Sequence, residues 1–342
     1  MKSADLQVFA ESLSRMLSAG VPILSALESI AADTKNRRSK KIIEEIAQRI
    51  SEGKSLTDSF AEKPAVFDPI FQATVKAGEV GGHLDSSLKQ ISDNLKRENE
   101  LIDNIKTAAI YPVLVITVLA IVLIIVITFV IPRITTVFAR LPISLPLPSR
   151  ILLIVGSFLN NNLLGVFLFL VTAGVAIFLS FKFKLIKLGF LASLPPVKNL
   201  ISKIDLVRFS QTLSTLLASG VPIIQSLELC QKIVLTSAIS ADLGKIKAEV
   251  ESGKNLADSF KKSKSFPATI AQLVGVGEKS GTLDKSLADI AEYYHTKVIT
   301  EVRALTSLVE PILLIIVGIV VGMVILAIIG PIYQLIGQLS AR

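Results

Sequence analysis

The sequence is poor in the side chains that most enzymes use. Its 342 residues include no tryptophan, one cysteine (Cys230) and two histidines (His83 and His295). A single cysteine excludes an intrachain disulfide framework and fits a reducing compartment. Neither histidine has the spacing of a zinc site, and the basic residues are scattered without an aromatic platform for nucleic acid. These absences argue against an enzyme, a bound cofactor and a nucleic-acid partner.

Long apolar runs are what the chain has in abundance. It is 51% hydrophobic, and its mean hydropathy of +0.62 is far above that of a soluble protein. Three runs without charge each cover the ~20 residues that a membrane helix needs. We therefore expect transmembrane helices at 108–132, 163–181 and 309–337, the last followed by a short external C-terminus. Because three asparagines at 160–162 interrupt the middle run, 133–162 is expected to form an external linker with an interfacial helix.

A stretch near the N-terminus occurs twice. Residues 9–28 recur at 209–228 with apolar residues at helical spacing, followed by Gly-Val-Pro. A glycine just after the last apolar position suits the left-handed end of one helix, and proline suits the first turn of the next. Both stretches therefore predict helix, tight corner, helix. The residues that define the corners are Phe9, Gly20 and Pro22 in one repeat and Phe209, Gly220 and Pro222 in the other.

A second repeated stretch contains a glycine-flanked pair of acids, and we expect it to be a loop that starts a long helix. The residues are Gly78, Glu79, Gly82 and Asp85, repeated 199 positions later as Gly277, Glu278, Gly281 and Asp284. The acid pairs are weak candidates for a metal site, since Ca²⁺ prefers several oxygen ligands. We favour the alternative that each aspartate lies in the first turn of the long helix and each glutamate accepts loop amide hydrogen bonds.

Each long helix leads to an apolar run through a proline. The first run begins near Tyr111-Pro112 and the last near Glu310-Pro311. An acid at the membrane edge needs a partner if it is buried among helices, and is merely solvated if it is not. Both interpretations of Glu310 remain open.

The soluble parts, 1–107 and 182–308, are expected to be two homologous helical bundles, so the fold class is all-α with three transmembrane helices. Two spans separate the bundles, which must then face one side. Lysines and arginines near the spans are more numerous on that side, so both repeats and the N-terminus should be cytoplasmic. The second repeat holds 17 basic and 11 acidic residues, against 15 and 16 in 1–108. This surplus suits a solvated face better than an acidic or lipid partner.

The corners, the Gly-Glu stretches and the three apolar runs, taken in order, resemble the type II secretion system F / type IV pilus assembly PilC family, including its competence-pilus members. The resemblance covers nearly the whole chain. It implies an inner-membrane platform protein that forms a homo-oligomer in contact with membrane lipid. It also implies three kinds of protein partner: a hexameric cytoplasmic ATPase, pilin or pseudopilin subunits, and other inner-membrane assembly proteins.

The residues alone favour an assembly scaffold without an active site, and the resemblance implies that it helps insert or extract pilin-like subunits. The alternative is a small transporter or channel subunit formed by oligomerisation. Three spans per chain with almost no charge in them argue against a substrate path. We expect partners to dock on the exposed faces of the two bundles.

Overall fold

The computed structural model of the chain describes residues 1–126, 129 and 195–340, and the regular structure in these residues is helical. The first repeat contains α1 (Ser3–Ser18), α2 (Ile23–Asp33), α3 (Arg37–Ser51), α4 (Leu56–Ala61), α5 (Pro69–Gly81) and α6 (Leu84–Ile125). The second contains α10 (Pro195–Ala218), α11 (Ile223–Ile233), α12 (Ser237–Glu251), α13 (Leu256–Lys261), α14 (Ala268–Ser280) and α15 (Leu283–Ser307), followed by α16 (Val309–Ser340). The expected linker at 133–162, its interfacial helix and the expected span at 163–181 lie outside the described residues.

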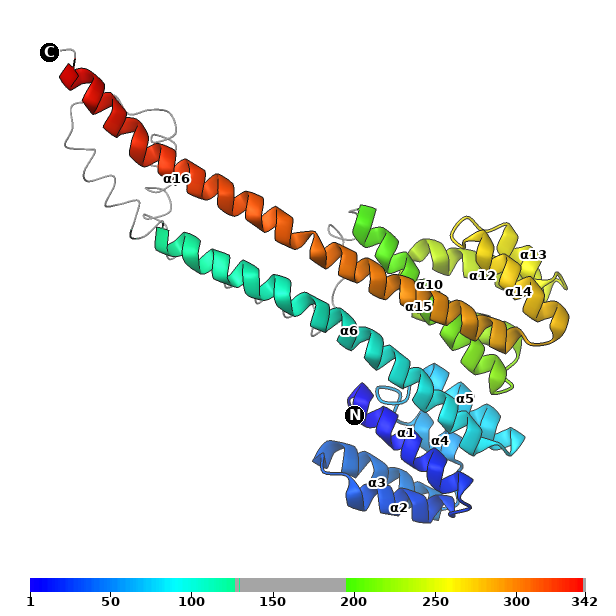
Figure 1. Cartoon of the computed structure of the whole chain (residues 1–342). Helices are drawn as coiled ribbons and strands as arrows, with labels where there is room; N and C mark the ends of the chain where they lie inside the picture. The colour runs from blue at the N-terminus through cyan, green and yellow to red at the C-terminus, as the bar shows by residue number, and fades with distance from the viewer. Residues whose placement is uncertain (127–128, 130–194, 341–342) are drawn as a thin grey trace. The chain divides into compact units, whose positions relative to one another are not determined.

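The chain divides into two compact units. One joins Met1–Ile105 with Leu194–Glu301 and so holds the helical bundles of both repeats. The other joins Lys106–Ser193 with Val302–Arg342. Within the first unit, α1 to α5 gather around the start of α6, and α10 to α14 gather around α15 (Figure 1).

The helix–corner–helix prediction is confirmed in both repeats. Gly20 and Gly220 have φ angles of 80° and 77°, in the left-handed region that favours glycine. At the first corner the amides of Gly20 and Val21 donate to the carbonyl oxygens of Leu17 and Met16 at 2.9 and 3.0 Å. These two bonds form a Schellman motif, which satisfies carbonyl groups that the end of α1 would otherwise leave unpaired.

Two predicted helix starts are corrected. Pro22 and Pro222 are N-caps that precede α2 and α11, whereas the sequence suggested positions inside the first turn. The basic run Lys35–Lys41, whose dense charge suggests an exposed connection, is mostly helical because α3 begins at Arg37. The reason is local: the side chain of Asn36 accepts hydrogen bonds from two backbone amides of the first turn, which fixes the helix start there.

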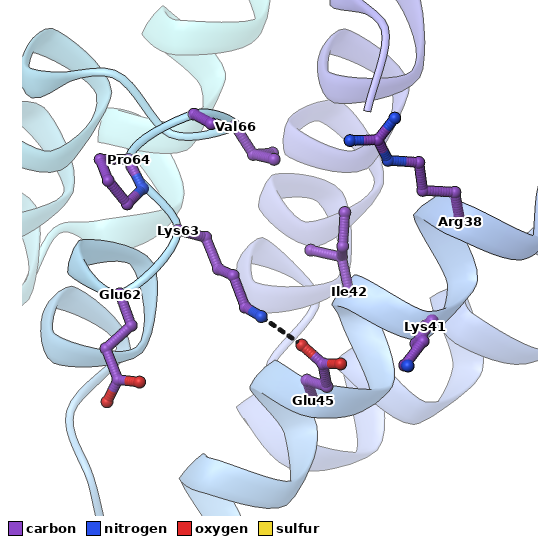
Figure 2. A pocket seen from close by; sticks show the side chains of 9 residues that line it. Arg38, Lys41, Ile42, Glu45, Glu62, Lys63, Pro64 and Val66 are labelled. Carbon is purple, nitrogen blue, oxygen red and sulfur yellow. Dashed lines mark ion pairs between the residues drawn. The ribbon is translucent and has the colours of Figure 1, made fainter.

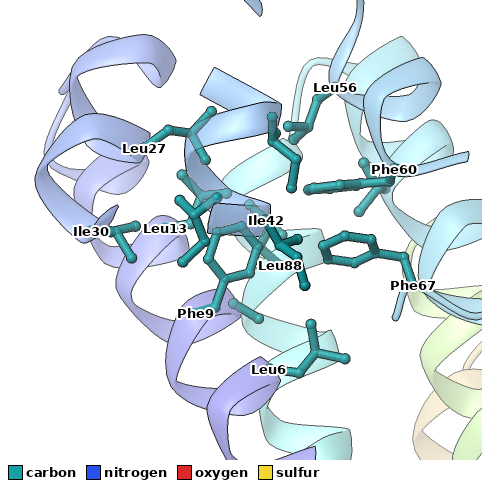
Figure 3. Packing of buried hydrophobic residues seen from close by; sticks show 14 of the residues in the cluster. Leu6, Phe9, Leu13, Leu27, Ile30, Ile42, Leu56, Phe60, Phe67 and Leu88 are labelled. Carbon is teal, nitrogen blue, oxygen red and sulfur yellow. The ribbon is translucent and has the colours of Figure 1, made fainter. Parts of the chain in front are cut away.

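Phenylalanines from α1, from α4 and from the connection between α4 and α5 form the centre of the first bundle (Figure 3). Phe60 and Phe67 stack with ring centroids 4.2 Å apart, and Phe9 meets both rings at 6.2 Å. All three side chains are at most 2% exposed. Burying a ring of this size contributes roughly 1.5–3 kcal/mol, and such aromatic contacts add about 1 kcal/mol. The equivalent Phe209, Phe260 and Phe266 also contact one another in the second bundle, where the Phe260–Phe266 pair is edge-to-face at 4.9 Å.

The repeats differ by one residue in a connection. The segment between α4 and α5 covers 62–68, and the one between α13 and α14 covers 262–267. The helices before this segment correspond at an offset of 200, and those after it at 199. The deletion therefore lies between helices, where insertions and deletions are tolerated, and it leaves the packed elements in register.

Two stretches of helix are long and apolar enough to cross a membrane. They are Leu84–Leu119, in α6, and Leu283–Ile319, in α15 and α16, with mean hydropathies of 1.5 and 2.0 in their most apolar windows. Their apolar side chains are exposed, as at Leu114 (58%) and Leu314 (66%), unlike those of a core helix in a soluble protein. These stretches reach the first and third expected spans.

Candidate functional site

The glutamate of each repeated Gly-Glu pair caps a short helix. Glu79 accepts hydrogen bonds from the backbone amides of Leu56 and Thr57 at 2.9 and 3.1 Å, at the first turn of α4. Glu278 does the same for Leu256 and Ala257 of α13, at 2.7 and 3.0 Å. The carboxylate satisfies free amides and sits at the positive end of the helix. The sequence predicts that the glutamates accept hydrogen bonds from loop amides. In the structure the donor amides belong to the starts of α4 and α13.

The Gly-Glu stretches are not loops, which corrects the sequence prediction. Gly78 and Glu79 lie in the last turn of α5, and only Gly82 has the left-handed conformation that ends the helix. Gly78 is required by a close crossing, since a Cβ there would lie 2.4 Å from Oγ of Ser87 in α6. Gly277 meets Ser286 in the same way, at 2.5 Å. Gly281 ends α14 as Gly82 ends α5.

The aspartate of each pair belongs to a different contact from the glutamate. Asp85 and Asp284 lie in the first turns of α6 and α15, as expected. Asp85 accepts a hydrogen bond from Oγ of Ser18 at 3.0 Å, and its carbonyl accepts one from Ser14 at 2.7 Å. The two acids of the first pair therefore fasten different parts of the bundle. Among the described residues, no group of three or more His, Cys, Asp or Glu is arranged to hold a metal ion.

A third pair of acids, Asp5 and Asp205, is not predicted by the sequence motifs. Asp205 is fully buried and accepts the backbone amides of Leu235 and Thr236 at 2.8 and 2.7 Å, just before α12. Asp5, its equivalent, accepts the side chains of Asn36 and Ser39. Both tie the first helix of a repeat to the start of its third helix. The one available signal was the occurrence of an aspartate four residues before each repeated phenylalanine.

Tyr111, Glu310 and Pro311, at the expected membrane edges, are exposed in the structure, whereas Pro112 is buried. Tyr111 is 55% exposed and Pro112 lies inside the continuous helix α6. Glu310 is exposed in the first turn of α16, next to Pro311. Gly318 and Gly322 of α16 face open space, since a Cβ added at either would meet nothing within 4 Å.

A recess of about 370 Å³ lies on the first repeat between α3 and the connection that follows α4. Figure 2 shows Arg38, Lys41 and Ile42 on one side and Pro64 and Val66 on the other. Glu45 pairs with Lys63 at 2.5 Å, which lowers the pKa of the glutamate. In the second repeat Asp242 replaces Ile42 and accepts Oγ of Ser263 at 2.6 Å.

The densest group of basic residues without an ion pair lies on the first repeat, although the net positive charge is larger on the second. Several lysines of the second repeat form ion pairs, namely Lys203, Lys232, Lys245, Lys247, Lys254, Lys261 and Lys262. Within the described part of the chain, no ion pair is formed by any of the five bases of 35–41: Lys35, Arg37, Arg38, Lys40 and Lys41. The positions equivalent to 35–41 in the second repeat carry no base.

These features define a class: an all-α membrane protein built from two equivalent helical bundles, with apolar helices of membrane-spanning length. The sequence profile of "Type II secretion system (T2SS), protein F" matches residues 9–132 and again 209–331. The chain belongs to this family.

Relatives from both branches of the family match along nearly the whole chain. The type IV pilus assembly protein PilC of Pseudomonas aeruginosa is 32% identical over 98% of this chain and 91% of its own length. PilC of Myxococcus xanthus is 29% identical, with 99% and 82% covered. The type II secretion system protein F of Pseudomonas aeruginosa is 30% identical, with 98% and 84% covered.

Proposed function

We propose that this protein is an inner-membrane platform of a type IV pilus or type II secretion-type machine. In that role it couples a cytoplasmic assembly ATPase to the insertion or extraction of pilin-like subunits. The observation that carries the proposal is the double match of the family profile, in which each match covers one bundle and the apolar helix that follows it. Relatives named for pilus assembly and for type II secretion support both variants of the machine.

The bundles are the docking surfaces in this proposal, and the membrane helices are the base that holds them. The first bundle offers an acidic partner the five cations of 35–41 beside the recess at Ile42 and Val66. Four of these cations, from Arg37 onward, lie at the start of α3, where positive charge is unfavourable because the helix dipole is positive at that end. An acidic surface on the ATPase would relieve this repulsion, so we place the ATPase contact here.

The first experiment is deletion of the gene in its own host, with complementation by the full-length protein. We expect loss of the pilus or of secretion, and co-purification of the tagged protein from detergent with the assembly ATPase. Normal pili and secretion in the deletion strain, together with no association with the ATPase or pilins, would contradict the proposal. A purified protein that moves a solute across liposomes on its own would support the transporter alternative.

A charge reversal tests the docking face. Arg38→Glu with Lys41→Glu should reduce ATPase co-purification about tenfold or more, since several charge contacts of ~0.5–1 kcal/mol each are lost or inverted. Lys264→Glu with Lys285→Glu makes the same change in charge at exposed positions of the second repeat and is the matched control. Equal loss of ATPase with both double variants would show that net charge, and not this face, governs the contact.

A further inference from the structure

The two bundles contact each other through α6 of the first repeat and α10 of the second. Oγ of Ser219 donates to Oε1 of Gln90 at 2.5 Å, and Nε2 of Gln211 donates to the carbonyl oxygen of Asn94 at 3.3 Å. Further along, a guanidinium nitrogen of Arg208 lies 3.7 Å from a carboxylate oxygen of Glu98. Along these contacts the residue numbers increase in α6 and decrease in α10, so the two helices run antiparallel. α10 also contacts α5.

The duplication maps this interface onto two other helices. α10 corresponds to α1 at an offset of 200, and α6 corresponds to α15 at an offset of 199. The equivalents of Arg208, Gln211 and Ser219 are Val8 and Glu11 of α1 and Ala19, which directly follows α1. Those of Gln90, Asn94 and Glu98 are Asp289, Tyr293 and Lys297 of α15. Each chain therefore contains one formed interface, between α6 and α10, and the two equivalent faces, on α15 and α1, of a second interface.

The equivalent faces are uncovered. At the α6–α10 interface Ser219 is fully buried and Gln211 is 9% exposed, whereas their equivalents Ala19 and Glu11 are exposed and half-buried. Val8 is 60% and Tyr293 46% exposed, where Arg208 and Asn94 are half-buried. Asp289 and Lys297 are also exposed. α14, the equivalent of α5, adds the exposed apolar side chains Leu273 (40%) and Val276 (63%). Exposed valine and tyrosine, at positions whose equivalents contact the other bundle, mark faces suited to a similar occupant.

The two free faces also match in charge. If the free faces met as α6 and α10 do, Glu11 would lie opposite Tyr293 and Val8 opposite Lys297. Ala19 would lie opposite Asp289. Arg15 of α1, which is 76% exposed and pairs with Glu11 at 2.5 Å, lies between Glu11 and Ala19 and so near Asp289. Each face thus carries one acid and one base, placed to meet the opposite charge.

We propose that α15 of one copy docks on α1 of a second copy of this chain, in the arrangement that α6 adopts on α10 within each chain. The contact is heterologous, so each copy uses its first repeat for one neighbour and its second repeat for the other. The four bundles of two copies then form one continuous row of equivalent contacts. The inference does not depend on the role proposed above.

Cross-linking of the full-length protein in membranes tests the contact. In a Cys230→Ala background, Val8→Cys and Lys297→Cys are placed on separately tagged copies that are expressed together and treated with a short bismaleimide. We expect a link between the two tags that joins position 8 to position 297. Glu98→Cys with Arg208→Cys in one chain is the reference pair and should link within the chain. Links of 8 to 8 or of 297 to 297, or no link while the reference pair reacts, would overturn the proposal.

Charge exchange gives a second test that a folding defect cannot imitate. Glu11→Lys alone and Lys297→Glu alone should each reduce association between copies about tenfold, by placing like charges together. Combining both substitutions in one chain should restore association, because the opposite charges face each other again. Glu44→Lys, at an exposed position of α3, is the matched control and should leave association unchanged. A double variant no better than the single ones would overturn the proposal.

Discussion

Glu79 and Glu278 are needed because the helices they cap are very short. α4 and α13 have six residues each, well below the length at which a helix is stable by itself in water. In α4 the side chain of Ser55 supplies a further cap, accepting the amide of Asp58 at 3.0 Å. In α13 the equivalent Asn255 forms no side-chain cap. The second repeat therefore depends more strongly on its glutamate.

Glu278→Gln should destabilise its bundle more than Glu79→Gln does. Replacing a carboxylate that accepts two amides costs about 1–2 kcal/mol, and only the first repeat retains a second cap. Hydrogen exchange of residues 256–261 and 56–61 in the full-length protein measures the local effect. Glu44→Gln, on an exposed face, is the control. Equal protection losses in the two helices would contradict the prediction.

Asp242 gives the second repeat a contact that titrates in acid. The hydroxyl of Ser263, with help from Ser265 and Lys245, holds the pKa of this carboxyl at about 2, below its usual value of 3.8. A depressed pKa means that the stabilisation is present above about pH 4 and is lost as the pH falls through 2. The side chain is only 15% exposed, so the contact contributes on the order of 2 kcal/mol.

Asp242→Asn should therefore loosen the 262–267 connection at pH 6 but have little effect near pH 2. Exchange rates of these backbone amides, corrected for the intrinsic pH dependence, measure this. The 62–68 connection of the first repeat serves as the internal control, because Ile42 replaces the aspartate there. The prediction fails if the variant and the parent differ by the same amount at both pH values.

A helix end or crossing can be predicted from sequence only where the residues that cause it are close together in the chain. Gly20 and Pro22 act on their own backbone, so the corner could be predicted from four residues. Gly78 acts through Ser87 on another helix, and nothing near Gly78 distinguishes a crossing glycine from a loop glycine. Asp205 likewise caps a helix 30 residues away. Such tertiary causes become visible only when the helices are placed together.

Gly78→Ala and Gly20→Ala should both destabilise the first bundle, for different reasons. At Gly78 the new methyl group would clash with Oγ and Cβ of Ser87, at 2.4 and 2.7 Å, and force α5 away from α6. At Gly20 nothing lies within 4 Å, and the cost of about 1 kcal/mol comes from the left-handed backbone. Ser87→Gly should partly rescue the first variant and not the second. Thermal unfolding of the four proteins in detergent tests this, and rescue of both or neither would contradict the crossing interpretation.

Duplication gives the two halves of the molecule the same set of helices but different surfaces. The largest core side chains repeat, as at Phe9 and Phe209 or Phe60 and Phe260, because packing tolerates little change there. The surfaces do not repeat: the cations of 35–41 occur once, and Arg208 and Gln211 stand where the first repeat has Val8 and Glu11. One bundle design can thus serve different partners on one side of the membrane, provided that the chain places both bundles there.

Whether both bundles lie on one side of the membrane depends on the number of spans between the repeats. Because an even number of spans there returns the chain to its starting side, Lys40→Cys and Lys264→Cys in a Cys230→Ala background should behave alike. A membrane-impermeant maleimide should label both in inverted vesicles and neither in right-side-out vesicles. Arg342→Cys, after one more span, should show the opposite pattern, because basic residues hold the repeats on the cytoplasmic side. Labelling of 264 with the pattern of 342 would mean an odd number of spans between the repeats, and would leave only the first bundle within reach of a cytoplasmic ATPase.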